Sequence, residues 1–226
     1  KSILHSFSEL YHNYNKNSSK IIEESCFNLE TAVPLFNLTK IKIYVIIKKT
    51  GGNIMKVIEA IKNRRSVRLY SGKKVSEVKL KRVLEAGRLA PSARNIQEWK
   101  FVVVRDKEIL RKLSVAANNQ EFIGRADSVI VGCSEITDYV MRCGQTAYPI
   151  DVAIAMTQMT IQAVEEGLGT CWIGSFYEEQ VKRILNIPAK VRIVQMLTLG
   201  YPEEKPEPRP RKDFDEVFYF NEWKEF

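Results

Sequence analysis

The sequence predicts an α+β domain, because helical and strand-like segments intermingle without the regular strand–helix–strand period of a doubly wound sheet. Continuous apolar runs at 101–104 and 128–133 are typical of strands. Amphipathic segments surround them, and a long apolar run at 148–166 has helical spacing. The chain has 226 residues, 45% of them hydrophobic, which is enough for one full domain and too little for two large ones.

The first half of the predicted domain begins with a helix at 57–65, where apolar residues recur at helical spacing. Ser76 is a suitable N-cap for a second helix, whose apolar face includes Leu89 and which Pro91 ends. The run 101–104 then predicts a strand buried on both faces. Asp106 predicts the cap of a short helix, and 128–133 predicts another buried strand.

The second half is predicted to begin with a long helix over about 148–166. Its apolar residues nearly encircle it, so it is either central or packed against a second subunit. A short strand at 171–174, a helix at 178–185 and a strand at 191–199 follow. A proline-rich stretch then runs to Pro210.

Residues 1–54 differ from the rest, because they lack a sustained helical or strand period. The pair Gly51-Gly52 shortly before Met55 is what a translated ribosome-binding site would encode. Our hypothesis is that the functional domain is 55–226 and that 1–54 are an upstream or dispensable extension. The alternative is a genuine N-terminal arm in which 41–47 add a strand to a sheet edge.

The formal net charge of +8 and the pI of about 9.2 raise the question of nucleic-acid binding. Basic residues alternate with acidic ones along the helices, and no basic stripe is interleaved with aromatic residues, so we expect a solvated basic surface plus an anion site. We expect no membrane span either, because the most apolar early run, 41–47, is far shorter than the roughly 20 residues that a span needs.

The cysteines, at 26, 133, 143 and 171, contain no Cys-x-x-Cys pair, and His5 and His12 are the two histidines. This composition predicts no metal site. Cys133 and Cys171 lie in apolar strand-like runs, where a thiol is usually a small buried hydrophobe. We expect reduced thiols and a cytoplasmic protein.

Three ordered segments carry a family resemblance. They are Arg64-Arg65-Ser66-Val67-Arg68, the stretch from Pro91-Ser92-Ala93-Arg94-Asn95 to Trp99, and Arg209-Pro210-Arg211-Lys212. Together they resemble the nitroreductase family of FMN-dependent oxidoreductases, from about Met55 to the C-terminus. One departure is visible: Glu98 stands where the family usually has proline.

The resemblance implies a three-layer α+β sandwich that forms an intimate homodimer. The C-terminal segment, here about 217–226, would extend over the partner. Its large apolar residues would otherwise form an exposed apolar patch.

The resemblance also implies an FMN site. The guanidinium group of arginine can donate two hydrogen bonds to a phosphate at once. By the matched motifs, the residues expected around the phosphate and ribityl chain are Arg64, Arg65, Ser66, Arg68, Arg209 and Arg211. The turn along the flavin ring would be formed by Pro91, Ser92, Ala93 and Asn95, and the strand end beside it by Ile173 and Gly174. Met141, Arg142 and Tyr148 are candidates for substrate selectivity. No residue is nominated as a catalytic acid or base, and Trp99 is expected in the core.

The implied function is reduction of nitroaromatics, quinones or similar small-molecule acceptors by NAD(P)H, in a ping-pong reaction through FMN. The sequence leaves three alternatives open. Two are other chemistries within the family, namely reductive dehalogenation or cleavage of the flavin. The third is a flavin-binding protein without turnover.

Overall fold

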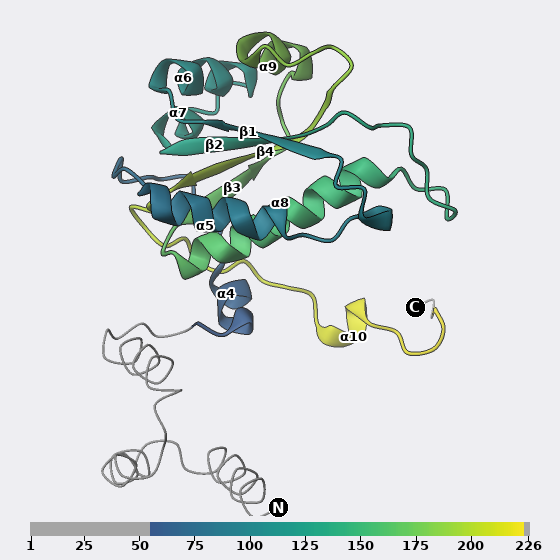
Figure 1. The fold of residues 1–226 in the computed structure, drawn as a ribbon. Helices are drawn as coiled ribbons and strands as arrows, with labels where there is room; N and C mark the ends of the chain where they lie inside the picture. The colour runs from purple at the N-terminus through teal and green to yellow at the C-terminus, as the bar shows by residue number, and fades with distance from the viewer. Residues whose placement is uncertain (1–54, 224–226) are drawn as a thin grey trace, which may run out of the picture. The chain divides into compact units, whose positions relative to one another are not determined.

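A computed structural model describes residues 55–223, whose elements are labelled as in Figure 1. The segments 1–54 and 224–226, and with them the proposed N-terminal extension, lie outside the described residues. The helices are α4 (Val57–Asn63), α5 (Glu77–Arg88), the 3-10 turn η1 (Ala93–Asn95), α6 (Lys107–Ala116), α7 (Phe122–Arg125), α8 (Ala147–Glu165), α9 (Glu178–Leu185) and α10 (Phe214–Val217). The strands are β1 (Trp99–Val104), β2 (Ser128–Ser134), β3 (Gly169–Ile173) and β4 (Arg192–Gly200).

The four strands form one antiparallel sheet in the order β1-β2-β4-β3. The longest pairing joins β2 to β4, with Ser128 opposite Leu199 and a register shift between Gly132 and Cys133. Every residue of β2 is buried, as expected for a central strand of apolar composition. β1 and β3 are the two edge strands.

Helices cover both faces of the sheet, which gives three layers (Figure 1). α5 and α8 pack on one face, and α6, α7 and α9 pack on the other. Side chains alternate between the faces along β2: Ile130 joins Val83 and Met156 of the first core, whereas Val129 and Val131 join the second. The α+β architecture expected from the sequence is confirmed.

The structure differs from the sequence-based expectation in several local respects. Phe101, Val102 and Val103 are only partly buried, because β1 lies at the sheet edge and one of its sides lacks a neighbour. Leu89 is 63% exposed, so it does not belong to the apolar face of α5, which ends at Arg88. The short helices α7 and α10 carry no helical period long enough to be recognised.

Other expectations are confirmed. Ser76 caps α5 by accepting a hydrogen bond from the Lys79 N–H, and Asp106 caps α6 by accepting one from the Ile109 N–H at 2.9 Å. Trp99 is buried in the core with α8. α8 buries one side against the sheet, but Ile150 on its other side is 41% exposed.

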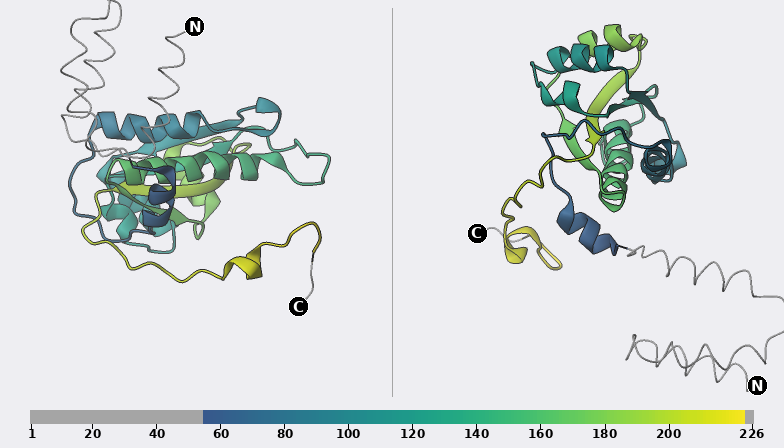
Figure 2. Two further views of the ribbon diagram at one scale, coloured as in Figure 1. Left: turned by 90° about the horizontal axis from the view of Figure 1, so that it is seen from below. Right: turned by 90° about the vertical axis from the view of Figure 1, so that its left-hand side faces the viewer.

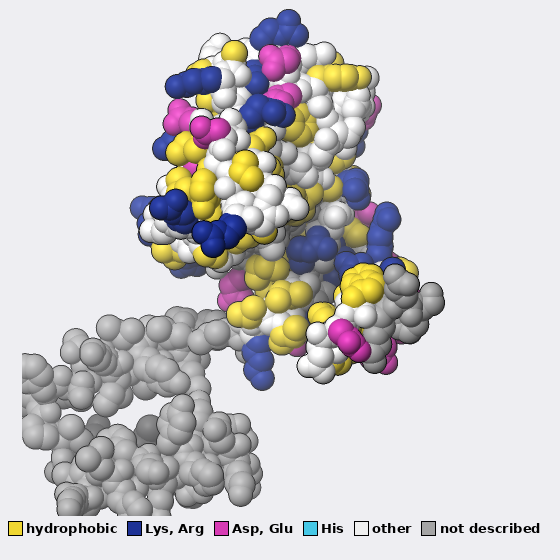
Figure 3. All heavy atoms as spheres, turned by 90° about the vertical axis from the view of Figure 1, so that its right-hand side faces the viewer, with side chains coloured by type: hydrophobic (Ala, Val, Ile, Leu, Met, Phe, Trp, Pro, Cys, Tyr) yellow, Lys and Arg dark blue, Asp and Glu magenta, His cyan; other side chains and the backbone are white. Residues whose placement is uncertain are grey.

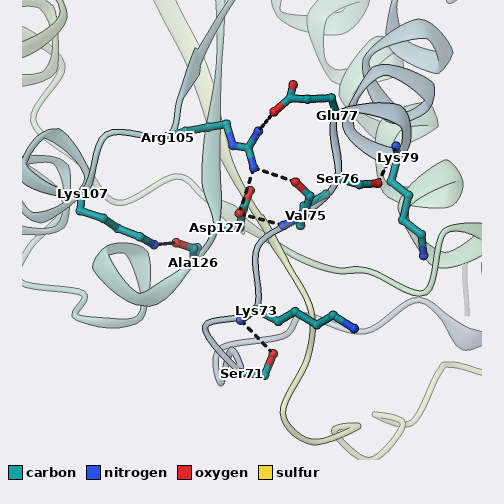
Figure 4. A network of polar contacts seen from close by, with 10 residues as sticks. All are labelled: Ser71, Lys73, Val75, Ser76, Glu77, Lys79, Arg105, Lys107, Ala126 and Asp127. Carbon is teal, nitrogen blue, oxygen red and sulfur yellow. Dashed lines mark hydrogen bonds and ion pairs between the residues drawn. The ribbon is translucent and has the colours of Figure 1, made fainter.

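A polar network fixes the loop that leads into α5 (Figure 4). Arg105, which follows β1, donates to the Val75 carbonyl at 2.7 Å and to Asp127 at 3.2 Å, and it also pairs with Glu77. Asp127 in turn accepts the Val75 N–H at 2.9 Å. The loop is therefore tied to the end of β1 through Arg105 and to the start of β2 through Asp127.

The C-terminal segment leaves the domain after β4 and runs alongside α4 as an extended chain before α10 (Figure 2). Its apolar side chains are exposed, from 51% at Val217 to 76% at Trp223. They contact mainly one another: the Phe214 and Phe218 rings lie 4.5 Å apart and the Tyr219 and Trp223 rings 4.9 Å apart.

Among residues 55–223, no helix is long and apolar enough to cross a membrane, and no group of three metal-ligating side chains gathers. Cys133 and Cys171 are buried as expected, and Cys143 is exposed; all three are free thiols. Burial raises the pKa of Cys133 to about 11 and also raises the pKa of Cys171. These two buried thiols are inert by position.

Candidate functional site: a cationic cavity beside the C-terminal segment

A cavity of about 450 Å³ lies between the end of α4 and the C-terminal segment. Six cationic side chains and one acid line it, together with Ser66 and three apolar residues: Lys62, Arg64, Arg65, Arg68, Arg209 and Arg211 with Glu207, and Ile61, Pro206 and Pro208. In Figure 3, Lys and Arg side chains gather in the hollow between the body of the domain and the C-terminal segment. The cavity therefore has a strongly positive potential.

Backbone pairing holds the first arginine motif in place. Ser66 forms a parallel bridge with Thr170 of β3, and the Val67 N–H donates to the Thr170 carbonyl at 2.9 Å. A few residues later the Ser71 N–H donates to the Tyr201 carbonyl at 3.0 Å. The motif thus covers the outer edge of β3 and then follows the chain that leaves β4.

Tyr70 anchors the same segment through its side chain. Its hydroxyl donates to the Val67 carbonyl at 2.9 Å and lies 2.6 Å from the Thr198 hydroxyl on β4. Burial raises the pKa of Tyr70, so this phenol stays protonated and remains a donor. The arginines on either side of Val67 are consequently held on a fixed backbone.

Arg65 is bound mainly to the protein itself. Its Nε donates to the Pro206 carbonyl at 3.2 Å, and its Nη1 donates to the Lys62 and Arg64 carbonyls at 2.6 and 2.9 Å. These bonds join the end of α4 to the C-terminal segment. Arg65 therefore shapes the cavity and has few donors left for a ligand.

Arg64, Arg68 and Arg209 have a different environment. Within residues 55–223 their guanidinium groups form no hydrogen bond or ion pair. Arg68 lies over the Phe122 ring, 5.8 Å from its centroid, and Arg211 donates only to the neighbouring carbonyls of Arg209 and Pro210. These side chains can offer paired N–H groups to an anion.

The turn after α5 forms a second polar feature. Arg94, Asn95 and Gln97 all have positive φ, at 52°, 57° and 55°, a conformation that is uncommon outside glycine. The Ser92 hydroxyl accepts the Gln97 N–H at 2.9 Å, which closes the turn. Asp151 of α8 accepts the Ala93 N–H at 2.9 Å. The side chain of Asn95 is exposed.

The candidates for selectivity lie at this same end of α8. Met141 and Arg142 belong to a short hairpin in which the Met141 N–H donates to the Gln145 carbonyl at 2.9 Å, and Tyr148 lies in the first turn of α8. The Arg94 guanidinium lies 5.9 Å from the centroid of the Tyr139 ring, so the turn and the hairpin are neighbours.

The third group of predicted residues follows β3. The Ile173 side chain is 1% exposed and packs in the core, so only its backbone faces a potential ligand. Gly174 is exposed, and a Cβ there would lie 3.4 Å from the Gln195 side-chain nitrogen.

A single chain does not bring all predicted residues together. Both arginine clusters and Ser66 meet in the cavity, whereas Pro91, Ser92, Ala93 and Asn95 do not line it. In Figure 1 the turn lies beyond the C-terminal end of α5, and α4 lies below the other half of the domain.

Some residues of the cavity and of the turn are not predicted from the sequence, although two of them have a weak signal in it. Lys62 extends the charge run of the first motif, and Asp151 is an isolated acid in an otherwise apolar stretch of α8. Phe122 and Pro206 offer no such signal, because only the fold brings them beside Arg68 and Arg65.

Comparison with known proteins identifies this α+β fold as that of an oxidoreductase. The particular family is the Nitroreductase family, whose model matches residues 61–120 and 113–201, and the chain belongs to it. The resemblance seen in the motifs is thereby confirmed.

Curated relatives agree with this assignment. A putative NADH dehydrogenase/NAD(P)H nitroreductase from Archaeoglobus fulgidus is 31% identical over 164 residues, which cover 71% of this chain and 90% of the relative. An FMN reductase [NAD(P)H] from Bacillus subtilis is 27% identical, with 69% of each protein covered.

Solved structures give the same result. A nitroreductase family protein from Clostridium novyi has a TM-score of 0.64 at 32% identity and covers 75% of this chain and 95% of its own. Another from Clostridium difficile has a TM-score of 0.68 at 28% identity and covers 75% of this chain and all of its own.

Proposed function

We propose that this oxidoreductase binds FMN, with the phosphate of the cofactor in the cationic cavity. The observation that carries the proposal is that three arginines line one cavity while their guanidinium groups have no acceptor among the described residues. They are Arg64, Arg68 and Arg209. A phosphate dianion needs several convergent donors of this kind. Glu207 is the one acid in the lining, so the cavity keeps an excess of positive charge.

We propose that a second copy of the chain completes the site. The turn with Asn95 does not line the cavity of its own chain, so a twofold dimer that places the turn of one copy against the cavity of the other would unite them. Exposed apolar groups on α8 and on the C-terminal segment, such as Ile150 and Trp223, are suited to such an interface.

In this arrangement each residue group has a separate task. Asn95 would hydrogen-bond to the edge of the flavin ring, and the backbone at Gly174 would approach the ring closely because no Cβ intervenes. Ser66 and the free arginines would hold the phosphate and ribityl chain. Bound FMN supplies the electron-transfer chemistry.

The proposed substrates are NAD(P)H as electron donor and nitroaromatics, quinones or similar acceptors, which would use one cavity in turn. Met141, Arg142 and Tyr148 would border that opening from the hairpin and the start of α8.

An absorbance spectrum of the purified full chain tests the proposal, followed by heat release and chromatography of the chromophore. We expect about one FMN per chain, and NAD(P)H oxidation with parallel double-reciprocal plots when donor and acceptor are varied. A colourless protein that also fails to take up added FMN would exclude the proposal.

A further inference from the structure

Glu98 is a buried acid without a partner. Its side chain is 6% exposed, and neither carboxylate oxygen accepts a hydrogen bond from any group in residues 55–223. It lies between the strained turn and Trp99, at the position where the resemblance leads one to expect proline. An isolated carboxylate in such surroundings is costly, because burial disfavours the charged form.

The charged group that faces Glu98 is another acid, Asp151 of α8, itself 3% exposed. No basic side chain of the described residues pairs with either of them. Burial raises the pKa of Glu98, and the Asp151 carboxyl group raises it further. In such a pair of buried carboxyl groups, ionisation of one opposes ionisation of the other.

Asp151 has a defined task of its own. Its Oδ2 accepts the Ala93 N–H at 2.9 Å, which fixes the start of the turn that carries Asn95. A negative charge on Glu98 would repel the Asp151 carboxyl group and disturb this bond, whereas a protonated Glu98 would not. The proton on Glu98 and the geometry of the turn are therefore coupled.

We propose that Glu98 is a positioning residue that carries a proton at neutral pH and donates it to Asp151 in a hydrogen bond, so that the acid pair holds the turn at 91–97 in its ligand-binding conformation. The observations behind the pair are the burial of both side chains, the unpartnered Glu98 oxygens and the bond from Ala93 to Asp151. Its effect on a cofactor rests on the proposed function, in which Asn95 of this turn contacts the flavin ring.

The sign of the pH effect follows from the raised pKa. Between the pKa of the unfolded chain and that of the folded chain, the folded state binds more protons. Stability therefore falls as pH rises through this window, and the loss is complete above the folded pKa. The turn itself is disturbed only once Glu98 ionises in the folded protein, so FMN affinity should fall above the folded pKa, by up to about tenfold per pH unit.

The test uses Glu98→Gln and Asp151→Asn in the full chain. The amide introduced by Glu98→Gln mimics the protonated acid, and the amide introduced by Asp151→Asn keeps an acceptor for Ala93 while it donates to an ionised Glu98. Glu85→Gln is the matched control, because Glu85 is an exposed glutamate that pairs with Arg88 on α5.

Two measurements decide the outcome. Infrared difference spectra at pH 7 should show a protonated-carboxyl C=O band in the wild type and in Glu85→Gln but not in Glu98→Gln. FMN dissociation constants between pH 7 and 9 should rise for the wild type and stay nearly constant for Glu98→Gln and Asp151→Asn.

Absence of the infrared band from the wild type, or parallel affinity profiles for the wild type and Glu98→Gln, would overturn the inference. If none of the proteins binds FMN, the proposed function fails, but the infrared band and the pH dependence of thermal unfolding still decide whether the acid pair exists.

Discussion

Adjacent arginines of one motif have different tasks in this structure. Arg65 donates to three backbone carbonyls and closes the cavity, whereas Arg68 rests on the Phe122 ring and presents its donors to the cavity. The sequence identifies both as members of one motif but cannot separate these tasks, because the carbonyl of Pro206 and the ring of Phe122 are brought close only by the fold.

This difference gives a prediction for single substitutions. Arg68→Gln should weaken FMN binding by about tenfold or more, since a hydrogen bond to a charged group contributes roughly 1.5–3 kcal/mol, and it should leave the stability of the ligand-free protein unchanged. Arg65→Gln should instead lower the ligand-free melting temperature.

Calorimetric titration with FMN and thermal unfolding of the same samples separate the two effects. Arg111→Gln is the control, since Arg111 is an exposed arginine of α6 paired only with Glu108. Equal losses of affinity and stability in Arg65→Gln and Arg68→Gln would contradict the assignment.

At the scale of elements, the sequence predicts most helices and strands to within a few residues. The helix at 178–185 is reproduced in full, and the buried strand at 128–133 matches β2 closely. Exposure of β1 could not be predicted in the same way, because a strand is central or at an edge according to which distant strands pair with it. α7 is too short to show a period.

The site was predictable to a similar degree. That both arginine clusters lie close together could be predicted from the family pattern, and in the structure both line one cavity. The separation of the turn from that site within one chain could not, since it depends on how α5 and α8 pack.

The backbone of β3 at Gly169 lies so close to Val67 of the first arginine motif that there is no room for one additional methyl group. A Cβ at Gly169 would lie 2.8 Å from Cβ of Val67 and 2.6 Å from its Cγ2. Gly169→Ala should therefore push the segment at 66–68 from the sheet edge, at a cost of about 1–3 kcal/mol in stability, and weaken FMN binding.

Gly124→Ala is the matched control, because a Cβ there meets Arg111 only at an ordinary 3.7 Å. Chemical denaturation of both variants measures the free energies of unfolding. A Gly169→Ala protein as stable as Gly124→Ala would show that the segment moves freely.

The C-terminal segment of the domain exposes several large apolar side chains to solvent, which is unusual for a chain end that contacts nothing else. Phe214, Phe218, Phe220 and Trp223 are each more than half exposed. A proposed partner would cover them, so a chain truncated before Phe214 should dissociate at concentrations where the full chain is dimeric.

Light scattering after size-exclusion chromatography measures this change in mass. The doubly substituted Glu108→Gln/Glu121→Gln protein keeps the segment and controls for the loss of negative charge, because both glutamates are exposed and lie elsewhere on the surface. A monomeric full chain, or a truncated chain that dimerises equally well, would refute the proposed assembly.

The bond from Arg65 to the Pro206 carbonyl spans 141 positions of the chain. During synthesis β4, which ends at Gly200, leaves the ribosome almost together with Pro206, so most of the chain must emerge before the sheet is complete and before the cavity forms. Its walls close only when the last part of the polypeptide folds back along α4. An anion bound there can consequently stabilise the folded domain only after nearly the whole chain has been synthesised.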